Sequence, residues 1–222
     1  DAAPADDATR VYLDLSSLKL SDEEKKCGLT LGTSFPHWRL LVDGLTGFAS
    51  SMFLQAKIHM VEGTCEELHK WINVFKRNIN KLRMDNAREN KALADRMKSA
   101  DWKLPLSVEY TSRATPQQNS MVETKFAMLV GRMQAMYEAA TVPKGIIRHK
   151  LSPMCARNAT KMSNFELVEI DGKTATRWEH MTGSLPNWTA HPRVFGEAGV
   201  VKLVFPYASK LENRGKECMF VD

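Results

Sequence analysis

The sequence predicts an α/β domain built on a mixed β-sheet with helices on its faces. Apolar and polar residues alternate over residues 10–17, which is typical of a strand, and residues 38–42 and 48–55 are predicted to be two further strands. Further along the chain, segments with helical spacing of apolar residues alternate with short strand-like segments. Successive strands favour antiparallel pairing, whereas strands separated by helices favour parallel pairing, so both kinds are expected in one sheet.

The first strand, residues 10–17, is the clearest of these elements. Its aliphatic side chains alternate with polar ones, so Asp14 lies on the face opposite the aliphatic residues. The polar run 22–26 that follows is predicted to be a solvent-exposed loop. The next two strands are expected to form a hairpin, because the turn dipeptide Asp43-Gly44 lies between them.

The later elements follow from the spacing of their apolar residues. Cys65 lies in the apolar stripe of the first helix and is expected to be a buried thiol. His69, one turn along the same helix, could share a metal ion with Cys65, but no other ligand is evident. The four cysteines include no Cys-x-x-Cys pair, which favours free thiols in a reducing compartment. The predicted helices cover residues 61–79, 90–100, 120–140 and 145–164, and the predicted strands cover 80–84 and 106–111.

Composition divides the chain into three parts. The small and acidic residues 1–9 are expected to form a flexible lead-in, and residues 10–165 a core domain. Residues 166–222, rich in Gly, Pro and Trp, are expected to form a small irregular C-terminal appendage, partly extended. The net charge of +5 permits a polyanionic partner without requiring one. No apolar run approaches the roughly 20 residues of a membrane span, so no membrane partner is expected.

Three acidic residues occupy positions that suit metal chemistry. Asp14 lies within the first strand, Asp85 ends the strand before the second helix, and Glu123 lies in the first turn of the long helix. If the first and fourth strands are neighbours, Asp14 and Asp85 project close together. Carboxylates this close repel one another unless a cation lies among them, and oxygen ligands favour Mg²⁺ or Mn²⁺ over zinc. Spacing alone leaves open that all three are ordinary surface acids.

Several motifs follow one another in the order seen in copia-type retrotransposon integrases, which the chain resembles from about residue 10 to 221. The most specific is the TPQQN loop, which is followed four residues later by Glu123. The motifs are RVYLDLSS, WRLLVDGLTGF, KLRMDNAREN, EYTSRATPQQNSMVETK and HPRVFGEAGVVKL. The resemblance implies a ribonuclease H-like, five-stranded mixed sheet flanked by helices.

The resemblance also implies a chemistry. It places a catalytic triad and metal site at Asp14, Asp85 and Glu123, holding two Mg²⁺ ions with Mn²⁺ as an alternative. The reaction would be attack of a 3′-hydroxyl at the end of element DNA on a phosphodiester of target DNA. The residues expected to contact DNA are Asn86, Gln118, Asn119, Lys125, Arg148, Lys150 and Lys161.

A biological setting follows from the same resemblance. The chain would be part of a Gag-Pol polyprotein, with its C-terminal extension leading toward the reverse transcriptase region. Its partners would be DNA, as element ends and target, and further copies of itself in a homo-oligomer. It would act in the nucleus, or in a cytoplasmic virus-like particle before nuclear entry.

Some residues depart from the family pattern, and alternatives remain open. None of the departures removes a triad carboxylate, but together they indicate a divergent lineage or a decaying copy. Asp43 is the main alternative to Asp14 as the first carboxylate, although its place at a strand end beside a glycine favours Asp14. A ribonuclease H-like nuclease and an inactive or domesticated nucleic-acid-binding relic are the alternative functions. The departures are Gly44, Ala87, Arg88, Ser120 and Thr124.

Overall fold

The computed structural model describes residues 9–19, 22–26, 33–111, 119–187, 193–202 and 215–221. The predicted lead-in apart from Thr9, the candidate DNA contact Gln118, and Cys27 lie outside these residues. In the described part of the chain, no helix is both long and apolar enough to pass through a membrane.

The centre of the molecule is the predicted mixed sheet, with strand order β3-β2-β1-β4-β5. β1 pairs antiparallel with β2, and β2 with β3, whereas β1 pairs parallel with β4, and β4 with β5. The first and fourth strands are therefore neighbours. The strands are β1 Arg10–Ser17, β2 His37–Asp43, β3 Ala49–Leu54, β4 Lys81–Met84 and β5 Ser107–Tyr110.

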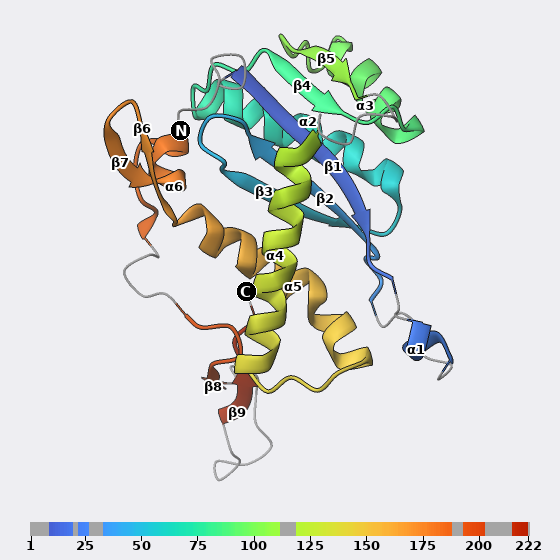
Figure 1. Ribbon diagram of the computed structural model, residues 1–222, viewed down its shortest axis with the longest axis vertical. Helices are drawn as coiled ribbons and strands as arrows, with labels where there is room; N and C mark the ends of the chain where they lie inside the picture. Colours follow the sequence, from blue (N-terminus) through green and yellow to red (C-terminus); the bar gives the residue numbers. More distant parts are fainter. Residues whose placement is uncertain are drawn as a thin grey trace.

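Helices cover both faces of this sheet. In Figure 1, α4 crosses the front of the sheet over β1 and β2 with α5 below it, while α2 and α3 lie behind. The helical segments are α1 Asp22–Lys26, η2 Lys57–His59, α2 Met60–His69, η3 Lys70–Val74, α3 Arg88–Lys98, α4 Ser120–Ala139 and α5 Ile146–Asn164. The order of strands and helices matches the sequence prediction, apart from the additional short segments α1 and η2.

Two local predictions are wrong. The run predicted as a loop forms α1, where Lys25 Nζ lies 2.9 Å from Asp22 Oδ1; a single turn held by such a contact leaves no apolar periodicity to detect. The helix predicted over 61–79 ends at Val74, after a last turn of π-helix. Lys76 adopts a positive φ of 58°, which takes the chain out of the helix toward β4.

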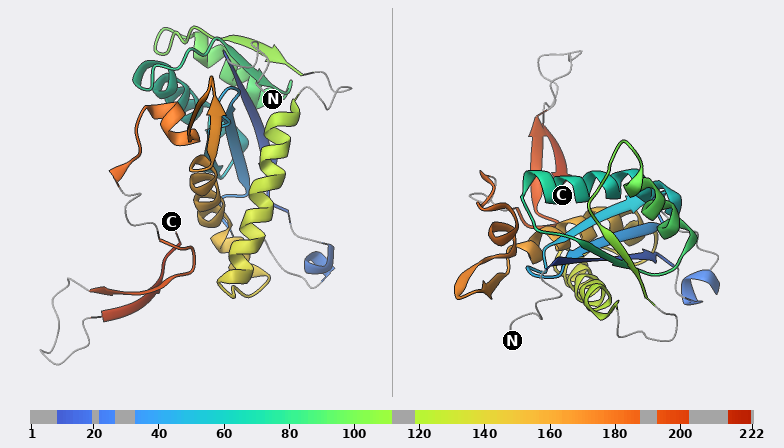
Figure 2. Two further views of the ribbon diagram at one scale, coloured as in Figure 1. Left: turned by 60° about the vertical axis from the view of Figure 1, so that its left-hand side comes forward. Right: turned by 90° about the horizontal axis from the view of Figure 1, so that it is seen from above.

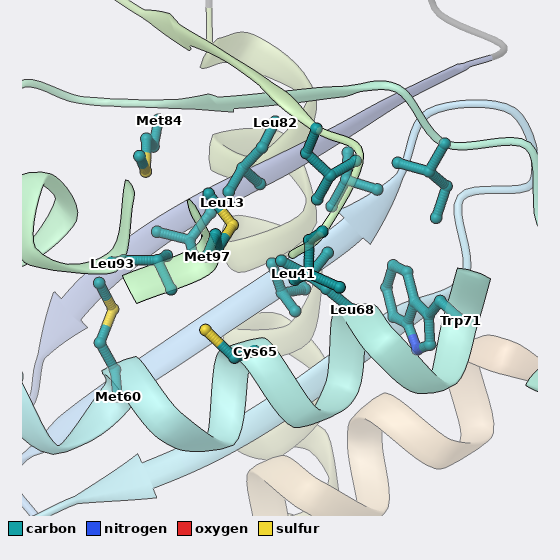
Figure 3. Close-up of a cluster of buried hydrophobic side chains, with 14 of the residues drawn as sticks. Leu13, Leu41, Met60, Cys65, Leu68, Trp71, Leu82, Met84, Leu93 and Met97 are labelled. Carbon is teal, nitrogen blue, oxygen red and sulfur yellow. The ribbon is translucent and has the colours of Figure 1, made fainter. Parts of the chain in front are cut away.

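The larger hydrophobic core lies between the sheet and the pair α2–α3. Figure 3 shows Leu13 and Leu82 of the sheet meeting Cys65 and Leu68 of α2, all completely buried. Leu93 of α3 closes the same cluster. The prediction of a buried Cys65 thiol is confirmed, and burial raises its pKa to about 11.

A second core fills the opposite face, beneath α4 and α5. Even-numbered β1 residues point to this side, so Tyr12 packs with Trp38 and Leu40 of β2. Val122 and Leu129 of α4 are completely buried against them, in the stripe that the sequence predicts. α4 contacts β1 and β2, and in Figure 1 it lies over these strands rather than over β4 and β5.

The C-terminal part consists of two hairpins and a short helix. β6 and β7 pair antiparallel, and α6 follows directly, with Thr176 and Glu179 forming a capping box at its first turn. β8 and β9 form a second antiparallel hairpin, which extends away from the core in Figure 2. The elements are β6 Leu167–Ile170, β7 Lys173–Thr176, α6 Arg177–Thr182, β8 Ala198–Lys202 and β9 Gly215–Met219.

Candidate active site

The register of β1 and β4 places Asp14 and Asp85 on the same face of the sheet. Tyr12 is paired with Arg83 in this parallel ladder, and each acid lies two residues further along its strand direction. Side chains two residues apart share a face of a strand. Both carboxylates therefore belong to the face that carries α4, opposite the aliphatic face of Val11 and Leu13.

The start of α4 brings Glu123 to the same place. Asn119, the residue before the helix, is buried and its Nδ2 donates to the Leu13 carbonyl oxygen at 3.5 Å, a long contact that ties the helix start to β1. Glu123 lies in the first turn and is exposed. Among the described residues, none donates a hydrogen bond to its carboxylate, so both oxygens are available to a ligand.

The electrostatics of Asp14 indicate that the three acids are neighbours. Burial raises the pKa of Asp14, the backbone N–H of Leu15 lowers it at 2.8 Å, and the charges of Asp85 and then Glu123 raise it further. Lys57 has a smaller lowering effect on this pKa. Two other carboxylates thus make ionisation of Asp14 less favourable, which is the repulsion expected of acids that share a cation site.

Asp85 is held in place by the beginning of α3. Its Oδ1 accepts hydrogen bonds from the Ala87 backbone N–H at 3.0 Å and from Asn90 Nδ2 at 2.5 Å. Asn90 Nδ2 also donates to the Asp85 carbonyl oxygen at 3.2 Å. These contacts fix the carboxylate at the end of β4, while the neighbouring Asn86 stays exposed beside it.

The three acids offer oxygen ligands of the kind that a hard divalent cation prefers, although they do not form a closed cluster in the structure. In the part of the chain that the structure describes, no three His, Cys, Asp or Glu side chains are gathered closely enough to hold a metal ion. The donors are oxygens only, and one of them, Asp14, is disfavoured as an anion by the other two. A cation such as Mg²⁺ would relieve that repulsion.

Asp43 has a structural role, which separates it from Asp14. It is completely buried, and its Oδ2 accepts hydrogen bonds from the Thr46 backbone N–H at 2.9 Å and the Thr46 hydroxyl at 2.7 Å. Arg77 forms an ion pair with the same oxygen at 3.1 Å. These partners leave this carboxylate engaged in holding the β2–β3 turn, so it is not available as a metal ligand.

Basic side chains lie on the same sheet face as Asp14 and Asp85, two to four residues before them along β1 and β4. Arg10, Lys81 and Arg83 surround Glu109 of β5, with N–O separations of 2.9, 3.7 and 2.8 Å respectively. All three cations contact this one carboxylate. In Figure 1, α4 lies over β1 and β2 and not over β4 and β5, the strand that carries Glu109. An anionic polymer lying across this surface would reach the carboxylates.

The other predicted DNA-contacting residues are dispersed. Arg148 forms an ion pair with Glu138 at 2.9 Å and lies over the Tyr137 ring, between α4 and α5. Lys150 is exposed on α5, and Lys161 lines a cleft of about 160 Å³ between α5 and β3. Lys125 is buried on α4. Only Asn86 and Asn119 of this set, among the described residues, adjoin the three carboxylates.

Three residues of the site escaped sequence reasoning. Asn90 holds Asp85, Lys57 acts on Asp14, and Arg83 belongs to the basic surface. A polar residue among the inward-facing positions of α3 is the one signal that points to Asn90, which is 2% exposed. Lys57 comes close only because the segment after β3 packs near the end of β4, where it forms an ion pair with Glu89 at 3.6 Å.

Comparisons with known proteins give a structural likeness only. No protein-family model and no curated protein sequence matches the chain. A chain in the cryo-EM structure of the simian T-cell lymphotropic virus intasome in complex with PP2A regulatory subunit B56 gamma is similar, with a TM-score of 0.55 and 12% identity, over 96% of this chain and 67% of that one. The catalytic core domain of BIV integrase is similar, with a TM-score of 0.46 and 13% identity, over 78% of this chain and 93% of that one. The intasome likeness shows the fold, and it confirms the predicted ribonuclease H-like sheet with flanking helices.

Proposed function

We propose that this chain is the catalytic core of a retrotransposon integrase and joins the ends of element DNA to target DNA. The observation that carries the proposal is that Asp14 and Asp85 share one sheet face, and that the charges of both Asp85 and Glu123 raise the pKa of Asp14. The fold shared with an intasome chain supports it. The copia-type sequence motifs supply the narrower assignment to an element-encoded Gag-Pol polyprotein.

In the proposed reaction, the 3′-hydroxyl oxygen of an element end attacks a phosphorus atom of the target backbone. A new phosphodiester forms as the target's own P–O3′ bond breaks, and the leaving oxygen takes up a proton. One ester replaces another, so no nucleotide is consumed. Two Mg²⁺ ions held by the three carboxylates would stabilise the charges on the attacking and leaving oxygens.

The residues of this chain would contribute position and charge. Asn90 keeps the Asp85 carboxylate oriented, and Asn119 keeps the start of α4 against β1, so the acids are prepared before DNA arrives. The basic surface of Arg10, Lys81 and Arg83 lies where DNA phosphates would approach. Contacts from Asn86, and further away from Lys150 and Lys161 on α5, would extend the DNA path. A homo-oligomer acting in the nucleus, or in a virus-like particle, completes the proposal.

A strand-transfer assay tests the proposal. The purified chain is incubated with a labelled DNA duplex as donor and a supercoiled plasmid as target, with Mg²⁺ or Mn²⁺ present. Joined product is expected from the wild type and from Asp95→Asn, which alters an exposed acid on α3. Asp85→Asn is expected to abolish joining, because the amide keeps the shape of the side chain but loses its charge. Joining that survives Asp85→Asn would overturn the site assignment.

Two other outcomes would favour the alternative functions. Cleavage of an RNA–DNA hybrid without joining would indicate a ribonuclease H-like nuclease that uses the same carboxylates. Calorimetric titration with Mn²⁺ and with DNA separates the non-enzymatic relic, because such a relic would bind DNA without taking up metal.

A further inference from the structure

Lys125 is a buried cation on α4 that the proposed reaction does not use. The residue is 7% exposed and lies on the inward side of the helix with Val122 and Leu129. No described residue accepts a hydrogen bond from its ammonium group. Lysine is almost never fully buried without a partner, because an unpaired charge loses its hydration. The position therefore calls for a negative ligand.

The charged groups that act on Lys125 are themselves positive. Burial, then Arg177, then Arg132 lower the pKa of Lys125, to about 7. Arg132 lies seven residues along α4, two turns away on the same side, and Arg177 is the first residue of α6. Burial also lowers the pKa of both arginines, and Arg177 lowers that of Arg132 further. Lys125, Arg132 and Arg177 are called the α4–α6 cationic cluster below.

Among the described residues, Glu166 is the carboxylate that forms ion pairs with this cluster. Glu166, just after α5, forms an ion pair with Arg132 and another with Arg177, whose Nε lies 3.3 Å from Glu166 Oε2. Glu166 is not among the charges that act on Lys125. Among the described residues, three positive charges and one negative charge give the cluster a net charge of +2 when Lys125 is protonated. Lys125 is the member to which no described residue supplies a counter-charge.

The arginines of the cluster are held in position by the fold. Arg177 Nη1 donates to the Thr46 carbonyl oxygen at 2.8 Å, in the β2–β3 turn. Gly47 makes this approach possible, because a Cβ at that position would stand 2.2 Å from Arg177 Nη1. The side chains of Arg132 and Arg177 remain 31% and 23% exposed, so a ligand has an approach from solvent. A preformed, partly open set of cations is the arrangement that binds phosphate groups.

We propose that the α4–α6 cationic cluster is a binding site for a phosphate oxyanion, which supplies the counter-charge that Lys125 lacks. The site is separate from the carboxylates, because two residues of helix turn Lys125 about 200° away from Glu123. The inference therefore stands whether or not the chain catalyses strand transfer. The phosphate belongs either to a nucleic-acid backbone or to free phosphate, since the cluster recognises the charged oxygens that both share.

Sulfate is the probe that tests this site, because it keeps its charge of −2 between pH 6 and pH 8. Calorimetric titration at pH 6 should show one sulfate bound per chain of the wild type.

Lys125→Met removes the charge and retains a side chain that suits the apolar surroundings. It is expected to bind sulfate at least tenfold more weakly than the wild type at pH 6. Lys98→Met, at an exposed lysine of α3, is the matched control and should behave as the wild type. If Lys125→Met does not fold, Arg132→Gln replaces it, because this side chain is partly exposed and its loss should also weaken sulfate binding.

An oligonucleotide arm decides the source of the phosphate. If binding of a 16-nucleotide single strand weakens in Lys125→Met but not in Lys98→Met, the ligand is a nucleic-acid phosphate. If sulfate and inorganic phosphate compete for the site while oligonucleotide binding is the same in both variants, the ligand is free phosphate. Sulfate binding that is absent, or that is equal in wild type and Lys125→Met at pH 6, would overturn the proposal.

Discussion

Asp43 and Asp14 are expected to respond in opposite ways to removal of their charge. Asp43→Ala takes away the completely buried acceptor of Thr46 and Arg77, and leaves the Arg77 guanidinium, whose Nε is already buried without a described partner, uncompensated. Asp14→Asn removes a charge that burial, Asp85 and Glu123 already disfavour. The first change should destabilise the fold, and the second should not.

The size of the Asp43 effect follows from the contacts that are lost. Removing one partner of a buried, hydrogen-bonded ion pair costs about 3–5 kcal/mol, because the other charge stays buried without compensation. That is a large part of the roughly 5–15 kcal/mol by which a domain is stable. With a urea m-value of about 2 kcal/mol/M, the midpoint of unfolding should fall by about 1.5–2.5 M.

For Asp14 the pKa determines the sign. Its pKa is raised in the folded state, so the native protein holds this proton to higher pH than the unfolded chain does. The stability associated with the proton is present at low pH and is lost as the pH rises from the ordinary value toward the raised one. At pH 7 the wild type has the full penalty, which asparagine avoids. Without metal, Asp14→Asn should be at least as stable as the wild type.

Urea unfolding at pH 7, followed by tryptophan fluorescence and far-ultraviolet circular dichroism, measures both changes. A double-mutant cycle with Arg77→Met isolates the pair: the double variant should lose less stability than the two single losses added together. A loss under about 1 kcal/mol for Asp43→Ala, or a larger loss for Asp14→Asn than for Asp43→Ala, would refute the assignment of Asp43 to structure and Asp14 to the site.

Three further results are expected. Burial raises the pKa of Cys65 to about 11 and of Cys155 to about 12, whereas Cys218 is exposed. Iodoacetamide at pH 8 should therefore label Cys218 in the native protein and reach Cys65 and Cys155 only after denaturation, as peptide mapping by mass spectrometry would show. Glu109→Gln should lower stability by about 1 kcal/mol at pH 7, since Glu109 is part-exposed. Burial raises the pKa of Glu109, but hydrogen bonds from Arg10 and Arg83 lower it, and the net shift is downward. The stability that Glu109 contributes is therefore present at neutral pH. In urea titrations at different pH, it should be lost as the pH falls through the lowered pKa. Gly47→Ala should lower the stability measured by thermal unfolding more than Gly172→Ala does. Both residues have positive φ, which costs an alanine about 1–2 kcal/mol, but only at Gly47 does the new Cβ also meet Arg177. Equal losses of stability would contradict that contact.

The sequence predicted the elements that have regular local patterns. Alternation of side chains over β1 and the apolar stripe of α4 arise from the geometry of a single strand or helix, and both were confirmed by the burial of Leu13 and Leu129. Patterns of this kind act over two to four residues. They do not reveal the single turn of α1, which a local Lys25–Asp22 contact stabilises, nor the early end of the helix at Val74.

The sequence named the acids of the candidate site but not the residues that hold or surround them. Asp14, Asp85 and Glu123 were identified from their places in elements and from motifs, and their proximity depended on β1 and β4 being neighbours. Asn90 and Lys57 carry no periodic signal, because their role depends on which segments pack against the end of β4.

By itself, the amino-acid sequence determined the order of strands and helices and the faces that are buried, and it predicted three carboxylates as candidate metal ligands. Only the tertiary structure decided that Asp43 is engaged in the β2–β3 turn and that Lys125 lies buried among arginines. The reason is physical: periodicity depends on backbone geometry within one element, whereas the state of a charge depends on its hydration and on charges brought near it by distant segments. Arg177 is 52 residues from Lys125 along the chain, and only folding places them together.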